Sequence, residues 1–333
     1  MSSKLLARLD VRRWLAGAAV VGAGLLASCG DGDQIEPFAP TRILAFGDDL
    51  SVIEADGRKY SINAFTITDA TTTPPTESTT ELDCARNPLW IQTVATQFGL
   101  AFDRCLGTAT VATGQVLAQA GDKVADLARQ TLSVQGDALG EKDLALVMIG
   151  MNDILELYAQ YPTVSSSVLF DLARARGRAL GSFVNQLATT GPAVVVLTVP
   201  DIGKSPFALA QNITTGDATR SALITDLVET FNNSMSVRLI NDGRLIGLVY
   251  ADIEIQNMVA FPSSYGLVNV VLPACLETAP LPGCTTSTLV GANPITGAAT
   301  ATTWLWADSL RLSPAGQSRL GALAEARARN NPF

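Results

Sequence analysis

The stretch Phe46-Gly47-Asp48-Asp49-Leu50-Ser51 follows the short apolar run Ile43-Leu44-Ala45 and sets the fold expected for this 333-residue chain. An apolar run of this kind predicts a strand over residues 41–46 that is buried on both faces of a parallel sheet. Its abrupt end in a glycine and two aspartates brings an acidic side chain, Asp49, to the end of that strand. The chemistry of the chain depends on this residue and on what the C-terminal part places beside it.

Strands and helices alternate along the rest of the chain. Further buried strands are expected at 144–149, 193–199 and 245–251, and helices at 89–99, 170–188 and 221–240. This order predicts an α/β fold, a three-layer α/β/α sandwich with a mostly parallel sheet. Trp90, in the first of these helices, is expected in the core rather than in contact with a ligand. Residues 56–83 are polar, and we interpret them as a long loop placed to cover or shape a site.

Two blocks of the chain resemble signature blocks of the SGNH hydrolases, also called the GDSL esterases and lipases. Gly47-Asp48-Asp49-Leu50-Ser51 resembles their first block, in which position 49 carries the nucleophilic serine. Gly150-Met151-Asn152-Asp153 resembles their Gly-x-Asn-Asp block, whose asparagine amide donates a hydrogen bond to the oxyanion. Without the resemblance, Asn152 and Asp153 are also typical of residues that cap a helix after a strand.

Weaker matches to the family occur elsewhere in the chain. The family has a glycine whose backbone N–H also donates to the oxyanion; the best match is Gly107, in Cys105-Leu106-Gly107-Thr108, and Gly114 is the runner-up. Residues 200–206 and 261–269 are similar to segments of a lipase-like branch. The resemblance runs from about residue 41 to residue 325, and it implies the flavodoxin-like SGNH hydrolase fold in one domain, residues 41–330.

The last block departs from the family at the residue that matters most. In Asp308-Ser309-Leu310-Arg311, the family would have Asp-x-x-His, with the histidine as base and the aspartate as its orienter. Arg311 stands at the histidine position and Asp49 at the serine position. The two changes have opposite charges, so we expect an ion pair between Asp49 and Arg311, with Asp308 on the other side of the guanidinium.

This pattern leaves three functions open. A serine hydrolase needs a hydroxyl nucleophile and a base near neutral pH, and the chain contains no histidine at all. The first hypothesis is a degenerate ester hydrolase that binds or scaffolds at the cell envelope. The N–H groups that would bind an oxyanion would then donate either to the Asp49 carboxylate or to an anion or carbonyl group of a ligand. The second is an active hydrolase of acyl or acetyl esters that uses Asp49 as a carboxylate base. The third is a purely structural envelope component. Ser51 has no base, and we do not expect it to act as a nucleophile.

The first 28 residues have the features of a bacterial lipoprotein signal. Four basic residues precede an apolar run from Trp14 to Leu26, which is too short for a membrane span. The run ends in Leu26-Ala27-Ser28-Cys29, which resembles the lipobox in which the cysteine is diacylated; a plain signal peptide with an incidental cysteine is the alternative. Residues 29–40 would form a tether. In such lipoprotein families, an aspartate directly after the cysteine usually holds the protein at the inner membrane. Gly30 stands at that position here, so we expect the anchor to be in the outer membrane.

The charge of the chain limits the kinds of partner that it is expected to bind. Without residues 1–28 the chain has 19 basic and 30 acidic residues, a net charge of −11. Such a body repels nucleic acid and anionic lipid, so membrane attachment would come from Cys29. The expected ligand is an acyl ester or an acetylated glycan. No cofactor or metal is expected, and the sequence identifies no protein partner.

The four remaining cysteines, in a chain that is expected to be exported, predict disulfide bonds. They allow three connectivities, and proximity in the sequence favours Cys84 with Cys105 and Cys275 with Cys284. A zinc site is the alternative, but the chain has neither a Cys-x-x-Cys motif nor a histidine to support it.

Overall fold

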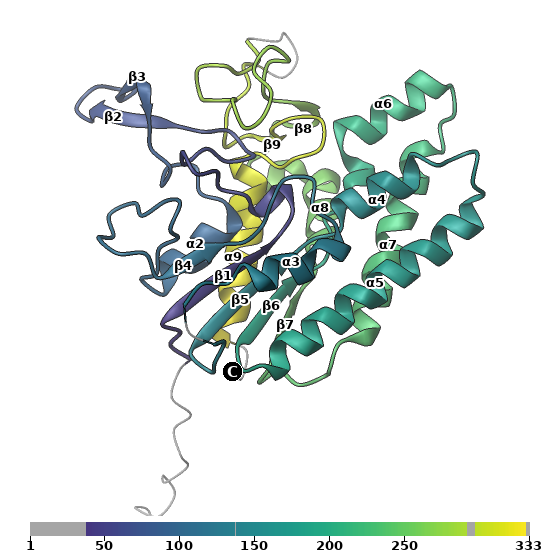
Figure 1. Ribbon diagram of the computed structural model, residues 1–333. Helices are drawn as coiled ribbons and strands as arrows, with labels where there is room; N and C mark the ends of the chain where they lie inside the picture. Colours follow the sequence, from purple (N-terminus) through teal and green to yellow (C-terminus); the bar gives the residue numbers. More distant parts are fainter. Residues whose placement is uncertain (1–37, 137, 292–296, 331–333) are drawn as a thin grey trace, which may run out of the picture. The chain divides into compact units, whose positions relative to one another are not determined.

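A five-stranded sheet forms the centre of the molecule (Figure 1). The computed structural model describes residues 38–136, 138–291 and 297–330. The strands pair in the order β4-β1-β5-β6-β7, and each neighbouring pair is parallel. Their bounds are β1 (Arg42–Gly47), β4 (Gly114–Val116), β5 (Asp143–Met148), β6 (Ala193–Leu197) and β7 (Ile246–Val249).

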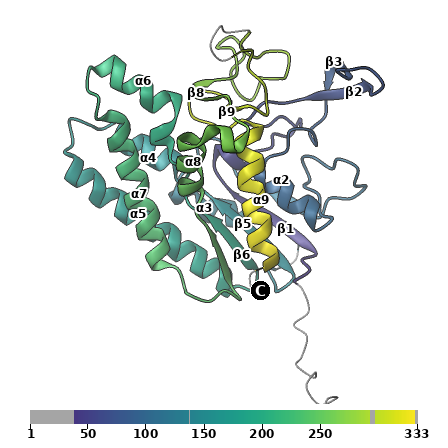
Figure 2. The ribbon, with the colours of Figure 1, turned by 180° about the vertical axis from the view of Figure 1, so that it is seen from behind.

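The strands have two opposite apolar faces, because successive side chains of a strand point to opposite sides. In β1, Ile43 and Ala45 belong to one apolar cluster, and Leu44 and Phe46 belong to the other. Figures 1 and 2 show helices on both sides of the sheet, so the three-layer α/β/α fold expected from the sequence is confirmed.

Each face has its own helices. The first face is covered by α2 (Trp90–Gln97), α8 (Ala251–Ala260) and α9 (Pro314–Asn330). The second is covered by α3 (Leu127–Leu132), α4 (Met151–Tyr158), α5 (Ser166–Thr189) and α7 (Arg220–Arg238), while α6 (Pro206–Thr215) packs on α7. Short 3-10 helices occur at η1 (Asp49–Ser51), η2 (Val124–Asp126), η3 (Ile202–Lys204) and η4 (Pro262–Tyr265).

The expected leader segment lies outside the described residues. The expected signal at 1–28, the lipidation site Cys29 and most of the tether fall in the part of the chain that the structure does not describe. Among the helices at 38–136, 138–291 and 297–330, none has the length and apolar character to cross a membrane.

The segment interpreted as a loop, residues 56–83, contains a hairpin. Strand β2 (Phe65–Asp69) pairs with β3 (Thr76–Leu82) in antiparallel register with irregularities. Their alternation of apolar and polar residues is weak because most of both strands is exposed. A second small sheet, β8 (Asn269–Pro273) with β9 (Trp304–Trp306), is parallel and precedes the Asp308–Arg311 segment.

Both disulfides have the pairing that sequence proximity favours. Cys84 is bonded to Cys105, and Cys275 is bonded to Cys284. A buried segment, residues 59–63, is tied to both loops: Lys59 Nζ donates to the carbonyl of Cys84, and Asn63 Nδ2 donates to that of Cys284.

The strand order indicates where a site is expected. The chain leaves β1 for β4 on one side, and then crosses to β5 on the other side of β1. In open α/β sheets, ligand sites lie outside the carboxyl ends of the strands where the order reverses in this way. Here the reversal lies between β1, which ends before Asp48, and β5, which ends before Gly150.

Candidate functional site

Asp48 connects the ends of the two central strands. Its Oδ2 accepts the backbone N–H groups of Gly150 and Met151 at 3.0 and 3.1 Å, where α4 begins. Its Oδ1 accepts from Leu50 N–H at 3.4 Å. Burial and the neighbouring Asp49 carboxylate raise the pKa of Asp48 to about 8, and the three N–H donors oppose that shift. Asp48 thus fixes the start of α4 against η1.

Asp49 is almost fully buried, with 1% of its surface exposed, and both of its oxygens have donors. Oδ1 accepts from Arg311 Nη2 at 2.5 Å and Nε at 3.1 Å. Oδ2 accepts from Asn152 Nδ2 at 2.8 Å and from the backbone N–H of Gly121 at 2.9 Å. Burial by itself would raise the pKa of Asp49, but the Arg311 charge and these hydrogen bonds together hold it below its usual value.

Arg311 lies between two carboxylates, as the sequence predicts. Its Nη1 donates to Asp308 Oδ2 at 2.9 Å, and the backbone N–H of Arg311 donates to Asp308 Oδ1 at 2.6 Å. The guanidinium also lies over the ring of Tyr60, 5.7 Å from its centroid. Burial opposes the charge of Arg311, but Asp308 and Asp49 hold its pKa above the usual value. Asp49, Arg311, Asp308, Asn152 and Gly121 are called the Asp49 cluster below.

The structure corrects the choice of glycine. Gly107 lies in an exposed segment beside Ala85, and its N–H is not among the donors to Asp49. Gly114, the runner-up, belongs to β4 and pairs with Ile43. The glycine N–H that meets Asp49 comes from Gly121, in the turn before η2, where a φ of +83° suits glycine. No sequence signal distinguishes Gly121 from the other glycines.

The remaining predicted residues around η1 are structural. Trp90 is buried in the core, and its indole Nε1 donates to Ser51 Oγ at 3.1 Å. Ser51 therefore points away from the Asp49 carboxylate, toward α2. Gly47 is confined as well, because a Cβ there would lie 2.5 Å from the carbonyl oxygen of Met148.

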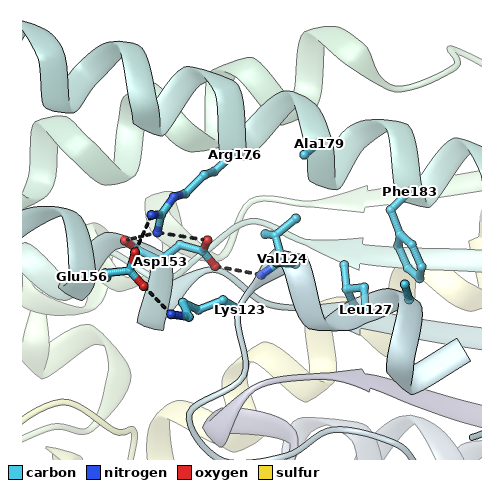
Figure 3. A pocket seen from close by; sticks show the side chains of 10 residues that line it. Lys123, Val124, Leu127, Asp153, Glu156, Arg176, Ala179 and Phe183 are labelled. Carbon is cyan, nitrogen blue, oxygen red and sulfur yellow. Dashed lines mark hydrogen bonds and ion pairs between the residues drawn. The ribbon is translucent and has the colours of Figure 1, made fainter.

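A second group of charged side chains includes Asp153 and Glu156 of α4 (Figure 3). Asp153 Oδ2 accepts the Val124 N–H at 2.9 Å, and Arg176 bonds Asp153 and Glu156. Glu156 also bonds Lys123. Asp153 therefore holds the η2 segment rather than capping its own helix. Lys123, Asp153, Glu156 and Arg176 are called the Arg176 cluster below.

The Arg176 cluster forms one end of an open cavity of about 370 Å³, whose other walls are the apolar side chains of Val124, Leu127 and Phe183 (Figure 3). Burial raises the pKa of Asp153, although Val124 N–H and Arg176 act in the other direction. Asn152 and Asp153 are consecutive, so the first turn of α4 serves both clusters. Since Asn152 Nδ2 also donates to the Asp122 carbonyl at 3.1 Å, both residues position the segment that carries Gly121.

In the Asp49 cluster, one guanidinium faces two carboxylates, and the remaining donors also bind Asp49. An oxyanion requires free N–H donors near a nucleophile. Here Gly121 and Asn152 donate to a carboxylate oxygen of the protein itself. Among the described residues, no group of three or more histidine, cysteine or acidic side chains has an arrangement that would hold a metal ion.

Comparisons with known proteins add a likeness in structure. No model of a known protein family matches the chain, and no curated protein matches it. Among solved structures it is similar to Axe2, an acetylxylan esterase from Geobacillus stearothermophilus. The two sequences are 13% identical. The structural match covers 88% of this chain and 96% of that chain, with a TM-score of 0.36. This is too distant to carry an argument about chemistry.

Proposed function

We propose that this chain is a catalytically degenerate protein of the SGNH ester hydrolase type, which binds or scaffolds at the cell envelope. The observation that supports this most directly is the Asp49 carboxylate, which accepts from Arg311, Asn152 and Gly121. The two groups that would stabilise an oxyanion are thereby occupied from within. Asp49 stands at the position of the nucleophile, and its carboxylate oxygen takes the place of the oxyanion that these donors would bind.

The geometry argues against Asp49 as a general base. A general base near neutral pH has a pKa close to that pH. The guanidinium of Arg311, 2.5 Å from Oδ1, contributes to a pKa of Asp49 below its usual value. A water molecule would also have to compete with four hydrogen bonds for the same two oxygens. The carboxylate-based hydrolase is therefore the alternative that the assay below tests.

The assay compares the native protein, lacking residues 1–29, with the Asp49→Ser, Arg311→His double variant. We expect no turnover of short or long p-nitrophenyl esters and no labelling by a fluorophosphonate by the native protein. The double variant, with the Gly121 and Asn152 donors released, should gain both, because Ser, His and Asp308 would then form a triad.

Asp49→Asn is the matched control, since it keeps the shape of Asp49 and removes its charge. Native turnover that disappears in Asp49→Asn would show that Asp49 works as a base and would refute the proposal. If the native protein is inactive, thermal shifts with acyl esters and acetylated glycans then distinguish a binding protein, which we propose, from a purely structural one.

The envelope location is part of the same proposal and rests on the sequence at Leu26-Ala27-Ser28-Cys29. The acidic body would not attract an anionic membrane, so a diacylated Cys29 would supply the attachment. Metabolic labelling with palmitate should mark the protein in the outer membrane fraction, and Cys29→Ala should abolish the label. A labelled Cys29→Ala variant, or unlabelled native protein, would contradict the anchor.

A further inference from the structure

The two edges of the central sheet differ in what covers them. At one edge, β4 carries an additional bridge to Phe102, and the Asp103 N–H donates to the Gly114 carbonyl. At the other edge, β7 pairs with β6 and with no further strand among the described residues. The free edge of β7 offers backbone groups to a partner.

The hydrogen bonds already made by β7 identify those groups. The carbonyls of Leu245 and Val249 accept from Val194 and Thr198 of the β6 side. Residues of a parallel strand alternate in the direction of their backbone groups, so the N–H and C=O of Leu248 point away from β6. The carbonyl of Ile246 points the same way, while its N–H donates to Asp242. The edge thus presents one donor and two acceptors.

A continuous hollow lies along this edge. One cavity, of about 450 Å³, extends from Leu248 and Tyr250 to Ile240 at the end of α7. Another, of about 390 Å³, extends from the same two residues to Ile253 on α8. Both include Leu248, Tyr250 and Arg327, so they form one groove with β7 at its base. Its apolar side chains are open to solvent, with Tyr250 54%, Ile253 49% and Ile240 40% exposed.

The groove has a positive charge that is not paired within the described part of the chain. Arg327 is exposed and lines both cavities, and it forms no ion pair within residues 38–136, 138–291 and 297–330. The other charges at the groove are already matched, because Arg244 pairs with Asp242, and Glu254 pairs with Arg319. A ligand with a carboxylate would complement Arg327.

We infer that the β7 edge binds an extended peptide segment of a partner protein, with alternating apolar side chains and a carboxylate. The segment adds a strand beside β7 and exchanges hydrogen bonds with Leu248. Its apolar side chains cover Tyr250, Ile240 and Ile253, and its carboxylate meets Arg327. A second copy of this chain fits less well, because its own β7 lies between the same two walls. The walls of both copies would have to pass each other before the two β7 strands could pair.

The test is a library of peptides of about eight residues, the length of an ordinary strand, selected on the purified domain. Selection should enrich apolar residues at alternate positions with one acidic residue or a free C-terminal carboxylate. Fluorescence anisotropy of the best peptide should show a loss of about tenfold or more in affinity for Arg327→Glu. Methylation of the peptide's backbone nitrogens should weaken binding equally, because it removes the strand's donors.

Matched controls make the outcome decisive. Ile213→Lys, at another exposed apolar side chain, on α6, should bind the peptide as the native domain does. No enrichment, or binding that tolerates Arg327→Glu and backbone methylation, would overturn the inference. So would self-association that Ile253→Asp abolishes, which would identify a second copy as the occupant. Tenfold tighter binding after removal of residues 331–333 would assign the groove to the chain's own end.

Discussion

The Asp49 cluster and the Arg176 cluster both include a residue of the first turn of α4, Asn152 in one and Asp153 in the other, and their ion pairs differ in exposure. The Asp49 carboxylate is enclosed, and the Arg311 side chain above it is 24% exposed. In the Arg176 cluster the Lys123 and Glu156 side chains are each 40% exposed beside an open cavity. Similar ion pairs therefore have different consequences: each charge of the Asp49–Arg311 pair depends on its partner, as buried Asp153 does in the second cluster, whereas water can replace a lost partner at the Lys123–Glu156 rim.

The largest effect is expected from Arg311→Ala. It leaves the Asp49 carboxylate buried without its counter-charge, and breaking a buried pair in this way costs about 3–5 kcal/mol. The free energy of unfolding, from urea denaturation, measures it. Arg319→Ala is the matched control, because Arg319 pairs with Glu254 at a more exposed site. Equal losses in the two variants would show that burial does not distinguish the Asp49 cluster.

A smaller loss is expected from Asp153→Ala, about 1–3 kcal/mol, the cost of leaving a buried donor unsatisfied. The Val124 N–H loses its acceptor, and Arg176 loses one of its carboxylates. Amide hydrogen exchange at 121–126 should rise more than exchange in the core strands. Unchanged exchange there would contradict the role of Asp153 in holding the η2 segment.

Asp49 and Asp153, one buried aspartate from each cluster, should respond to pH in opposite directions. The lowered pKa of Asp49 means that its contribution is present above about pH 4 and is lost as the pH falls through the folded-state value. The raised pKa of Asp153 has the reverse sign: its contribution is present below about pH 4 and is lost as the pH rises.

Unfolding free energies across this pH range, for the native protein, Asp49→Asn and Asp153→Asn, measure both effects. The advantage of the native protein over Asp49→Asn should shrink in acid, while its advantage over Asp153→Asn should be greatest in acid. Parallel pH curves for the two variants would contradict the assigned directions.

The smallest effect is expected from Lys123→Ala. Lys123 pairs with Glu156 at the rim of the cavity, where both charges remain hydrated, and exposed pairs of this kind contribute little. Thermal unfolding should not distinguish the variant from the native protein, at low or at high salt. A clear salt-dependent loss of stability would place the rim of the Arg176 cluster in the same class as the Asp49 cluster.

The sequence predicts the central fold because apolar runs such as 43–45 and 193–199 have only one favourable environment, the inside of a covered sheet. The resemblance to the SGNH hydrolases adds the pairing of Asp49 with Arg311, because it implies that these two residues of opposite charge stand at neighbouring positions of one site. These inferences use side-chain chemistry, which the sequence displays directly.

What the sequence does not predict depends on the backbone. Gly121 acts through its N–H, whose direction is set by the turn after β4, a strand of three residues. The hairpin of β2 and β3 is exposed and polar, so it lacks the alternation that marks a strand. Asp153 resembles a helix cap, and only the position of Val124 shows that it bonds another segment.

The Asp49–Arg311 contact joins residues that are 262 positions apart. Until the chain is synthesised past β9, the carboxylate at the end of β1 has no guanidinium to meet, and it remains hydrated. The chain up to β9 thus contains, at the end of β1, a carboxylate whose counter-charge lies further along the sequence. The segment that carries Arg311 leads directly into α9, which packs against α2, so the charge of Asp49 is balanced by the same part of the chain that completes the cover of that face of the sheet.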